Sequence, residues 1–159
     1  MGSTERLTAF QGAFERFLEA VNRVPVSRNG ETMETAAPKA ILAQLIVTNR
    51  VCRQACESLR VGQTPPRFVA SETEADRQLD ETGRLGSLDR TDLLEEAQAS
   101  KEDLLRYLSG LDAGEWNADR GVRHPEGGPA TILRELETLS RRYLDATDEI
   151  LLWLEPRRT

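Results

Sequence analysis

The sequence predicts an all-α protein, a four-helix bundle formed by a single domain over residues 1–159. Four segments of about 20 residues have apolar side chains at steps of three and four, and no segment alternates like a strand. The composition agrees, with 30% charged, 38% hydrophobic and only 5% aromatic residues, as is typical of soluble helical proteins. Such amphipathic helices bury their apolar stripes most simply around one shared core.

The first helix is predicted from about Ser3 to Arg23, with Ser3 or Thr4 as its N-cap. It ends before Pro25 and the Asn29-Gly30 turn. Its apolar residues fall on one stripe, which predicts that they face the core. The stripe consists of Leu7, Phe10, Phe14, Phe17, Leu18 and Val21.

The second helix is predicted to begin with Thr35 in the cap region and Pro38 in the first turn, where a missing amide hydrogen costs nothing. A long connection follows, as far as about Arg90, and residues 71–85 within it are predicted to form a short helix. A connection of this length in a compact domain is more often functional than idle. The predicted inner face of the second helix consists of Ile41, Leu45, Thr48, Cys52, Ala55 and Leu59.

The third helix is predicted from near Asp89–Asp92 to near Gly110, and the fourth from about Thr131 to Leu154. The long Gly- and Pro-rich loop between them holds Trp116 and His124. Since short loops are what enforce antiparallel neighbours, the long connection after the second helix predicts a topology other than plain up-down-up-down. The predicted inner residues are Leu94, Ala97, Leu104, Leu108 and Leu111, and then Ile132, Leu136, Leu139, Tyr143, Ala146, Ile150 and either Trp153 or Leu154.

Charge and hydropathy exclude two classes of partner. The formal net charge is −6 and the arginines are interleaved with acidic residues, so no nucleic-acid surface is expected. No stretch approaches the roughly 20 apolar residues that span a bilayer, and the first ten residues lack the regions of a secretion signal, so we expect a cytoplasmic protein without a membrane partner. Cys52 and Cys56 are predicted to be reduced core residues.

Three segments together resemble the DinB-like family of four-helix bundles, and the resemblance covers most of the chain. They are "APKAILAQLIVTNR", "LLEEAQASKEDLLRYLSGLDAGEW" and "GPATILRELETLSRRYLDATDEI". The family includes metal-dependent thiol transferases and the N-terminal domain of mycothiol-dependent maleylpyruvate isomerase. In its metal-binding members, one histidine from the second helix and an H-x-x-x-H pair from the fourth hold a divalent metal inside the bundle.

The resemblance places these three ligands at Gln44, Arg142 and Ala146. An amide binds metals weakly, a guanidinium does not deprotonate and alanine has no donor atom. We therefore predict that the protein binds no transition metal and needs no cofactor. Gln44 either points into the bundle, as a ligand would, or flanks the core. Arg142 either leans inward or forms a surface salt bridge with an acid such as Glu137 or Glu149.

The leading functional hypothesis is a metal-free bundle that binds a small molecule in a central pocket, in a natural-product self-resistance or biosynthetic role. The expected ligand-binding residues are Gln44, Thr48, Arg142 and Tyr143, with Asn49 or His124 as helpers. Whether a reaction follows binding is left open. One alternative is a metal-dependent thiol S-transferase whose ligands lie elsewhere. Another is a non-catalytic homodimer or interaction protein that uses the second-helix connection and an exposed Trp116 loop.

Overall fold

The chain is all-α in the computed structural model, which describes residues 2–25, 37–69 and 71–155. The predicted turn at Asn29-Gly30 and the predicted cap residue Thr35 lie outside these ranges. Within them the structure has no strand, and its one isolated β-bridge joins Arg123 to Pro129. The elements in chain order are α1 (Ser3–Asn22), α2 (Ala37–Arg60), the 3₁₀ helix η2 (Pro66–Phe68), α3 (Glu72–Gly86), α4 (Arg90–Ser109), α5 (Ala113–Trp116) and α6 (Ile132–Leu154).

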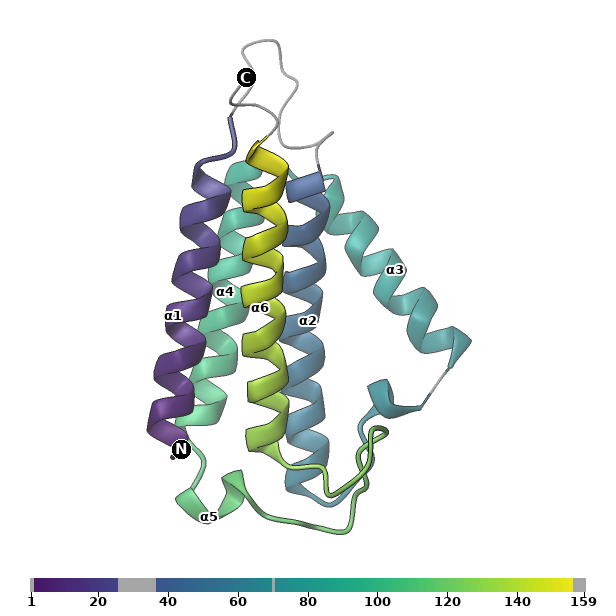
Figure 1. The fold of residues 1–159 in the computed structure, drawn as a ribbon. Helices are drawn as coiled ribbons and strands as arrows, with labels where there is room; N and C mark the ends of the chain where they lie inside the picture. The colour runs from purple at the N-terminus through teal and green to yellow at the C-terminus, as the bar shows by residue number, and fades with distance from the viewer. Residues whose placement is uncertain (1, 26–36, 70, 156–159) are drawn as a thin grey trace.

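Four long helices lie alongside one another, with α1 and α6 running in one direction and α2 and α4 in the other (Figure 1). The prediction that the topology is not up-down-up-down is therefore confirmed. α6 packs against both α1 and α2, while α2 packs against α4, α6 and α3. α3 leans away from the bundle, and we call η2 and α3 together the arm.

Helix starts follow the capping residues that the sequence offers. Asp89 accepts a hydrogen bond from the Asp92 amide at 2.8 Å, and Thr131 accepts one from the Arg134 amide at 3.2 Å. These caps satisfy amides that have no partner within the first turn. The predicted cap at Ser3 or Thr4 is wrong, because helical geometry already begins at Ser3 and the flanking N-cap is Gly2.

Aromatic packing fills the core between α1 and α6. The Tyr143 ring lies 5.6 Å from the Phe10 ring, centroid to centroid, and 5.5 Å from both Phe14 and Phe17. These tilted and edge-on contacts are the geometry that aromatic pairs prefer. The predicted stripe of α6 is buried at every position from Ile132 to Ile150, and Leu154 rather than Trp153 completes it.

A polar network crosses this core from α6 through α2 to α4. The Tyr143 hydroxyl donates to Asn49 Oδ1 at 2.7 Å, and Asn49 Nδ2 donates to Ser100 Oγ at 2.9 Å. Ser100 in turn donates to the Ala97 carbonyl at 3.0 Å. Because each member has a partner, the network satisfies groups that are costly to bury alone. Burial also raises the pKa of the Tyr143 hydroxyl.

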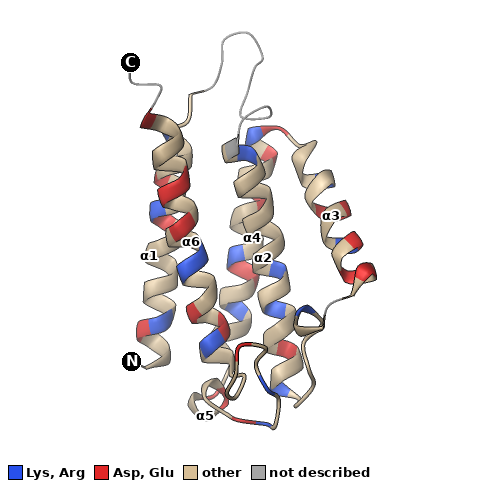
Figure 2. Cartoon of the chain, turned by 45° about the vertical axis from the view of Figure 1, so that its right-hand side comes forward, with Lys and Arg blue, Asp and Glu red and all other residues tan. Residues whose placement is uncertain are grey.

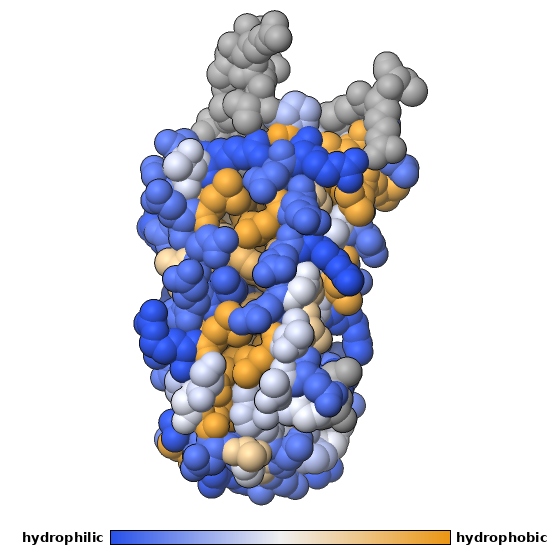
Figure 3. Space-filling model, turned by 90° about the vertical axis from the view of Figure 1, so that its left-hand side faces the viewer, coloured by the Kyte–Doolittle hydropathy of each residue, from blue (hydrophilic) through white to orange (hydrophobic). Residues whose placement is uncertain are grey.

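The outer surface is mixed in charge and only locally apolar. Lys and Arg lie among Asp and Glu over the helices, and acidic residues are frequent on α3 (Figure 2). On the side away from α3, apolar surface is visible in places between hydrophilic side chains (Figure 3). Lys101 of α4 lies over an aromatic ring of the core, with Nζ 5.1 Å from the Phe14 ring centroid. No helix in the described ranges has the length and apolarity to cross a membrane.

Candidate functional site

A groove of about 700 Å³ lies beside the bundle, between α2, α6 and the arm. The bundle helices supply most of its apolar lining, with Val47, Val51 and Cys52 from α2 and Leu139 from α6. The arm and the ends of the groove supply most of the polar groups. These further lining residues are Thr48, Arg67, Val69, Ser71, Glu72, Glu74, Ala75, Gln78, Glu135, Thr138 and Arg142.

The groove exists because the arm is attached at both ends and stands off between them. At the far end of α3, Leu85 is completely buried, and Arg50 of α2 pairs with both Glu81 of α3 and Glu96 of α4. Arg84 and Arg50 hold the pKa of the Glu81 carboxyl below its usual value. The N-terminal part of α3 is largely exposed and leans outward from the bundle (Figure 1). The space under this part is the groove.

An ion pair attaches the near end of the arm. Arg67 of η2 meets Glu135 of α6 through two parallel contacts, one of them from Nε to Oε1 at 2.9 Å. The Glu135 side chain is only 2% exposed, so the guanidinium compensates a carboxylate that would otherwise be buried alone. Arg67 also lies 4.7 Å above the Phe68 ring, and Phe68 meets the His124 ring edge-on at 5.1 Å. The pair thereby connects η2, α6 and the loop before α6.

The two cysteines lie under the groove, free and buried as the sequence predicts. Cys52 lines the groove, and its Sγ is 4.0 Å from the Glu135 carbonyl oxygen. Cys56 is completely buried one helical turn further on. A hydrogen bond with the Cys52 thiol, together with burial, raises the pKa of the Cys56 thiol well above its usual value.

Of the two alternatives for Gln44, the one in which it points into the bundle is wrong. Its side chain is exposed, and it lines a small second cavity of about 160 Å³ on the outside of α2 and α6. Arg142 is also exposed, and it lines both this cavity and the groove. The structure thus brings Gln44 and Arg142 together, but at the surface. The other residues around the small cavity are Ile41, Leu45, Asp145, Ala146 and Glu149.

Of the remaining two predicted site residues, Thr48 shares the groove with Arg142 and Tyr143 does not. Thr48 lines the groove, although its hydroxyl donates to the Gln44 carbonyl of its own helix at 2.8 Å. Tyr143 is 1% exposed, lines neither cavity and belongs to the core network. The central pocket expected between the helices is therefore filled by Tyr143 and its aromatic neighbours, and the larger opening lies beside α2.

Two predictions for the loop before α6 also need correction. Trp116 is 3% exposed and belongs to the core cluster, so it does not form an exposed docking surface. His124 is half-buried against Phe68, and its Nδ1 accepts a hydrogen bond from the Glu126 amide at 3.1 Å. Burial and the nearby Arg134 lower the pKa of the His124 imidazole. His124 lines neither of the two cavities.

Sequence reasoning missed Arg67, Glu135 and the valines of the groove. Glu135 carried the best available signal, because it lies four residues before Leu139, on the same side of the fourth helix. An acid at such a position needs a cation, and Arg67 is a cation in the long connection. Among the residues that the structure describes, no three His, Cys, Asp or Glu side chains are grouped so that they could hold a metal ion. The absence of a bound metal in the protein stays a prediction.

The comparisons with known proteins bear on the fold. No protein-family model matches the sequence, and no curated protein matches it. The structure is similar to the crystal structure of an uncharacterised protein from Escherichia coli UTI89, with a TM-score of 0.70 and 15% sequence identity. The match covers 99% of this chain and 95% of the other. At this identity the likeness shows a shared all-α fold over the whole chain.

Proposed function

We propose that the protein binds a small molecule with an apolar body in the groove between α2, α6 and the arm. The observation that carries the proposal is the groove itself, about 700 Å³ of space with apolar side chains from two bundle helices. Sites for small molecules have volumes of about 300 to 1,000 Å³, with mostly apolar walls and a few polar groups that fix orientation.

The polar groups of the groove are arranged for such a role. The Arg67–Glu135 pair closes one end, Arg142 lies at the other, and Thr48 and Thr138 lie between them on α2 and α6. The lining of α6 runs from Glu135 to Arg142, which lies seven residues further on and therefore about 10 Å along the helix. A ligand with an apolar body of that length would contact both bundle helices.

We also propose that the chain is a divergent DinB-like bundle with a natural-product self-resistance or biosynthetic role. The sequence resemblance supports the first part, together with the all-α fold and its four long helices. The groove supports the binding of a natural product in such a role, so the proposal concerns recognition of a ligand. In this proposal the interior of the bundle is filled by packed side chains, and the ligand binds in the groove beside α2.

Binding of the neutral dye Nile red, followed by fluorescence titration, tests the groove. Ala75 of α3 lines the groove and is exposed to solvent, so Ala75→Trp fills the groove without disturbing the core. We expect it to weaken dye binding by about tenfold or more. Thr73→Trp is the matched control, because Thr73 is exposed, does not line the groove and lies about 200° around the same helix.

The control variant should bind the dye as the unmodified protein does. Failure of the unmodified protein to bind the dye would contradict the proposal. Equal binding by Ala75→Trp and Thr73→Trp would contradict it too, because the dye would then lie outside the groove.

A further inference from the structure

At one end of the groove lies Arg142, a cation without a partner among the residues that the structure describes. We propose that the ligand of the groove is a carboxylate with an apolar body, and that Arg142 binds its carboxyl group. This inference rests on the proposed function and adds the chemical class of the ligand. Its basis is the charge pairing around the groove.

Arg142 lies where the groove and the small cavity adjoin, since it lines both. Its guanidinium has no hydrogen bond and no ion pair to any residue that the structure describes. The charge of the other groove cation, Arg67, is already neutralised by Glu135, which accepts from its Nε and Nη2. A guanidinium presents five N–H donors in a planar fork that matches a carboxylate. Arg142 is therefore the group in the groove with unused capacity for an anion.

The carboxylates of the groove do not offer the same opportunity to a cationic ligand. Glu135 is bound by Arg67, and Glu74 accepts from Arg77 at 2.6 Å, which holds the pKa of the Glu74 carboxyl below its usual value. Glu72 is exposed in the first turn of α3, where a negative charge is already favoured by the helix dipole.

The small cavity adds two carboxylates, from Asp145 and Glu149. Both are exposed, and neither has a bond to Arg142 in the structure. They restrict the anion to the groove side of the guanidinium, because an anion on the other side would meet both of them. Val51 and Leu139 then line the path of the apolar body on the groove side.

The class of ligand follows from this arrangement. About 10 Å of groove between the Arg67–Glu135 pair and Arg142 fits an aromatic or medium-chain carboxylic acid. Its carboxylate would meet Arg142, and its far end would meet the already neutralised pair. A doubly charged molecule would place its second charge against the apolar lining of Val47, Val51 or Leu139, which would desolvate that charge without compensation.

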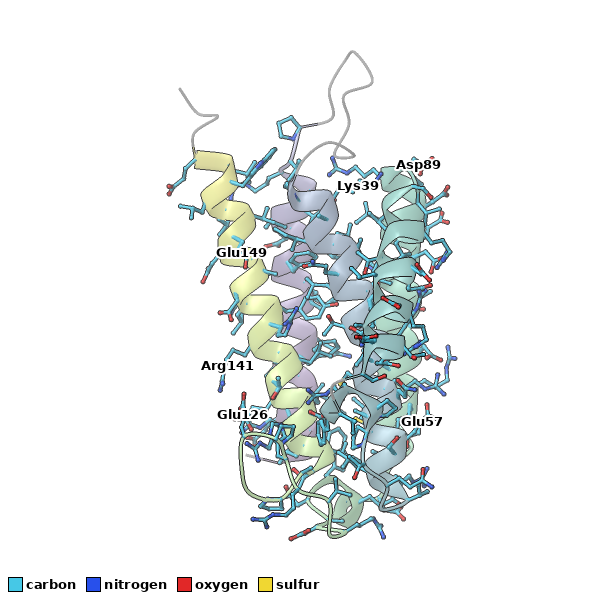
Figure 4. All side chains as sticks on the ribbon, turned by 90° about the vertical axis from the view of Figure 1, so that its right-hand side faces the viewer. Lys39, Glu57, Asp89, Glu126, Arg141 and Glu149 are labelled. Carbon is cyan, nitrogen blue, oxygen red and sulfur yellow. The ribbon has the colours of Figure 1, made fainter. Side chains whose placement is uncertain are left out.

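The test compares 2-naphthoate with 2-naphthalenemethanol, which share one ring system and differ in charge. Calorimetry on the full chain measures both compounds against the unmodified protein, Arg142→Gln and Arg141→Gln. Arg141 is the matched control, since it is the neighbouring exposed arginine, lines neither cavity and points away from the arm (Figure 4). Both substitutions remove the same charge.

We expect the unmodified protein and Arg141→Gln to prefer 2-naphthoate over the alcohol by about tenfold, the usual effect of a charge-assisted hydrogen bond. Arg142→Gln should lose this preference and keep its affinity for the alcohol. Equal affinities for acid and alcohol in the unmodified protein would overturn the inference and leave the groove as a neutral site. A preference for the acid that survives in Arg142→Gln would also overturn it. Absence of binding by both compounds, together with absence of Nile red binding, would contradict the proposed function itself.

Discussion

The inward amide of α2 is Asn49, five residues after Gln44. Five residues turn a helix by about 500°, so the two side chains point about 140° apart. Asn49 is completely buried and Gln44 is exposed, as this rotation requires. The resemblance that drew attention to Gln44 could not show this, because on sequence alone the two amides lie in an equally apolar stretch. What distinguishes Asn49 is its partners, Tyr143 and Ser100, which are 94 and 51 residues away.

Removing Asn49 should therefore cost far more stability than removing Gln44. Asn49→Ala leaves the Tyr143 hydroxyl buried without an acceptor, and we expect a loss of about 1 to 3 kcal/mol in the free energy of unfolding. Gln44→Ala should stay within about 0.5 kcal/mol, because the side chain is exposed. Urea unfolding of both variants measures the difference. If Asn49→Ala loses no more free energy of unfolding than Gln44→Ala, the core network contributes nothing to stability.

A second prediction at this scale concerns the thiols. Cys52 reaches the groove, whereas Cys56 is completely buried and has a raised pKa, so little thiolate forms there. We expect N-ethylmaleimide to label Cys52 well before Cys56, as read by mass spectrometry of digested protein. Ala75→Trp should slow the labelling of Cys52 by filling the groove. Labelling of both thiols at one rate would indicate that the reagent enters by unfolding of the chain.

Among the elements, α6 was predicted almost completely and α2 only in part. α6 packs along one broad face, against α1 and α2, so a single stripe with the helical period describes its burial. α2 meets α4, α6 and α3 on different sides, and a stripe cannot describe a helix that is covered from three directions. Its buried residues beyond the predicted face include Leu42, Ile46, Asn49 and Cys56.

Helix α3 of the arm was predicted, but its position was not. α3 begins at Glu72 with Ser71 as its cap, close to the predicted start. Only Leu85 of α3 is buried, so the helix has almost no apolar stripe that could indicate where it packs. It is held by ion pairs to residues that are distant in sequence, such as Arg50 to Glu81. Charged residues on a helix normally indicate a face in contact with solvent. The sequence does not show which of the charged residues of α3 form ion pairs with other helices.

The Arg67–Glu135 pair gives a prediction for the arm. Arg67→Met leaves the Glu135 carboxylate, whose side chain is only 2% exposed, without a compensating charge. We expect the free energy of unfolding to fall by about 3 kcal/mol. This is the lower end of the range for broken buried pairs, because the Arg67 side chain is itself 29% exposed. The double variant Arg67→Met/Glu135→Leu should recover most of this loss. Arg53→Met is the control, since the side chains of the Arg53–Asp103 pair are 36% and 47% exposed, and pairs accessible to solvent are worth less than about 1 kcal/mol. Urea unfolding of all four proteins gives the comparison, and a double variant no better than the single one would contradict the ion-pair explanation.

In the whole molecule, the fold is more predictable than the site. The fold depends on residues close together in the sequence, and the site depends on residues far apart in it. The fold follows from periodicity within each helix, which is local. The groove needs side chains of α2 and α6, more than 80 residues apart, under an arm whose position the sequence does not indicate. Of the predicted site residues, Thr48 and Arg142 line the groove, and both lie on helices whose ranges along the chain the sequence predicts. Arg67 and Glu135 were missed because their contact depends on the arm.

The stability of the whole molecule should fall on acidification, in two separate steps. Burial and Arg134 lower the pKa of His124 in the folded protein from its usual value near 6.5. The unfolded chain therefore takes up this proton first, and the free energy of unfolding falls as the pH decreases through about 6.5. The pKa values of Glu74 and Glu81 are lowered from 4.5 by Arg77 and Arg84, which places a second fall below about pH 4.5.

His124→Gln separates the two steps, because His124 is the only histidine in the chain and no other side chain of ordinary pKa titrates near pH 6.5. The measurement is the urea midpoint from pH 8 to pH 4 for both proteins. We expect the unmodified protein to lose stability between about pH 7 and 5.5, and His124→Gln to show a flat profile there and the same decline at lower pH. Any general effect of the net charge of −6 is shared by both proteins, so their difference reports the imidazole. The contrary outcome would be an unmodified protein that, relative to His124→Gln, is more stable at pH 5.5 than at pH 7.5. It would mean that the charged imidazole gains a partner. The nearby carboxylates that favour the charged form are those of Glu126 and Glu135.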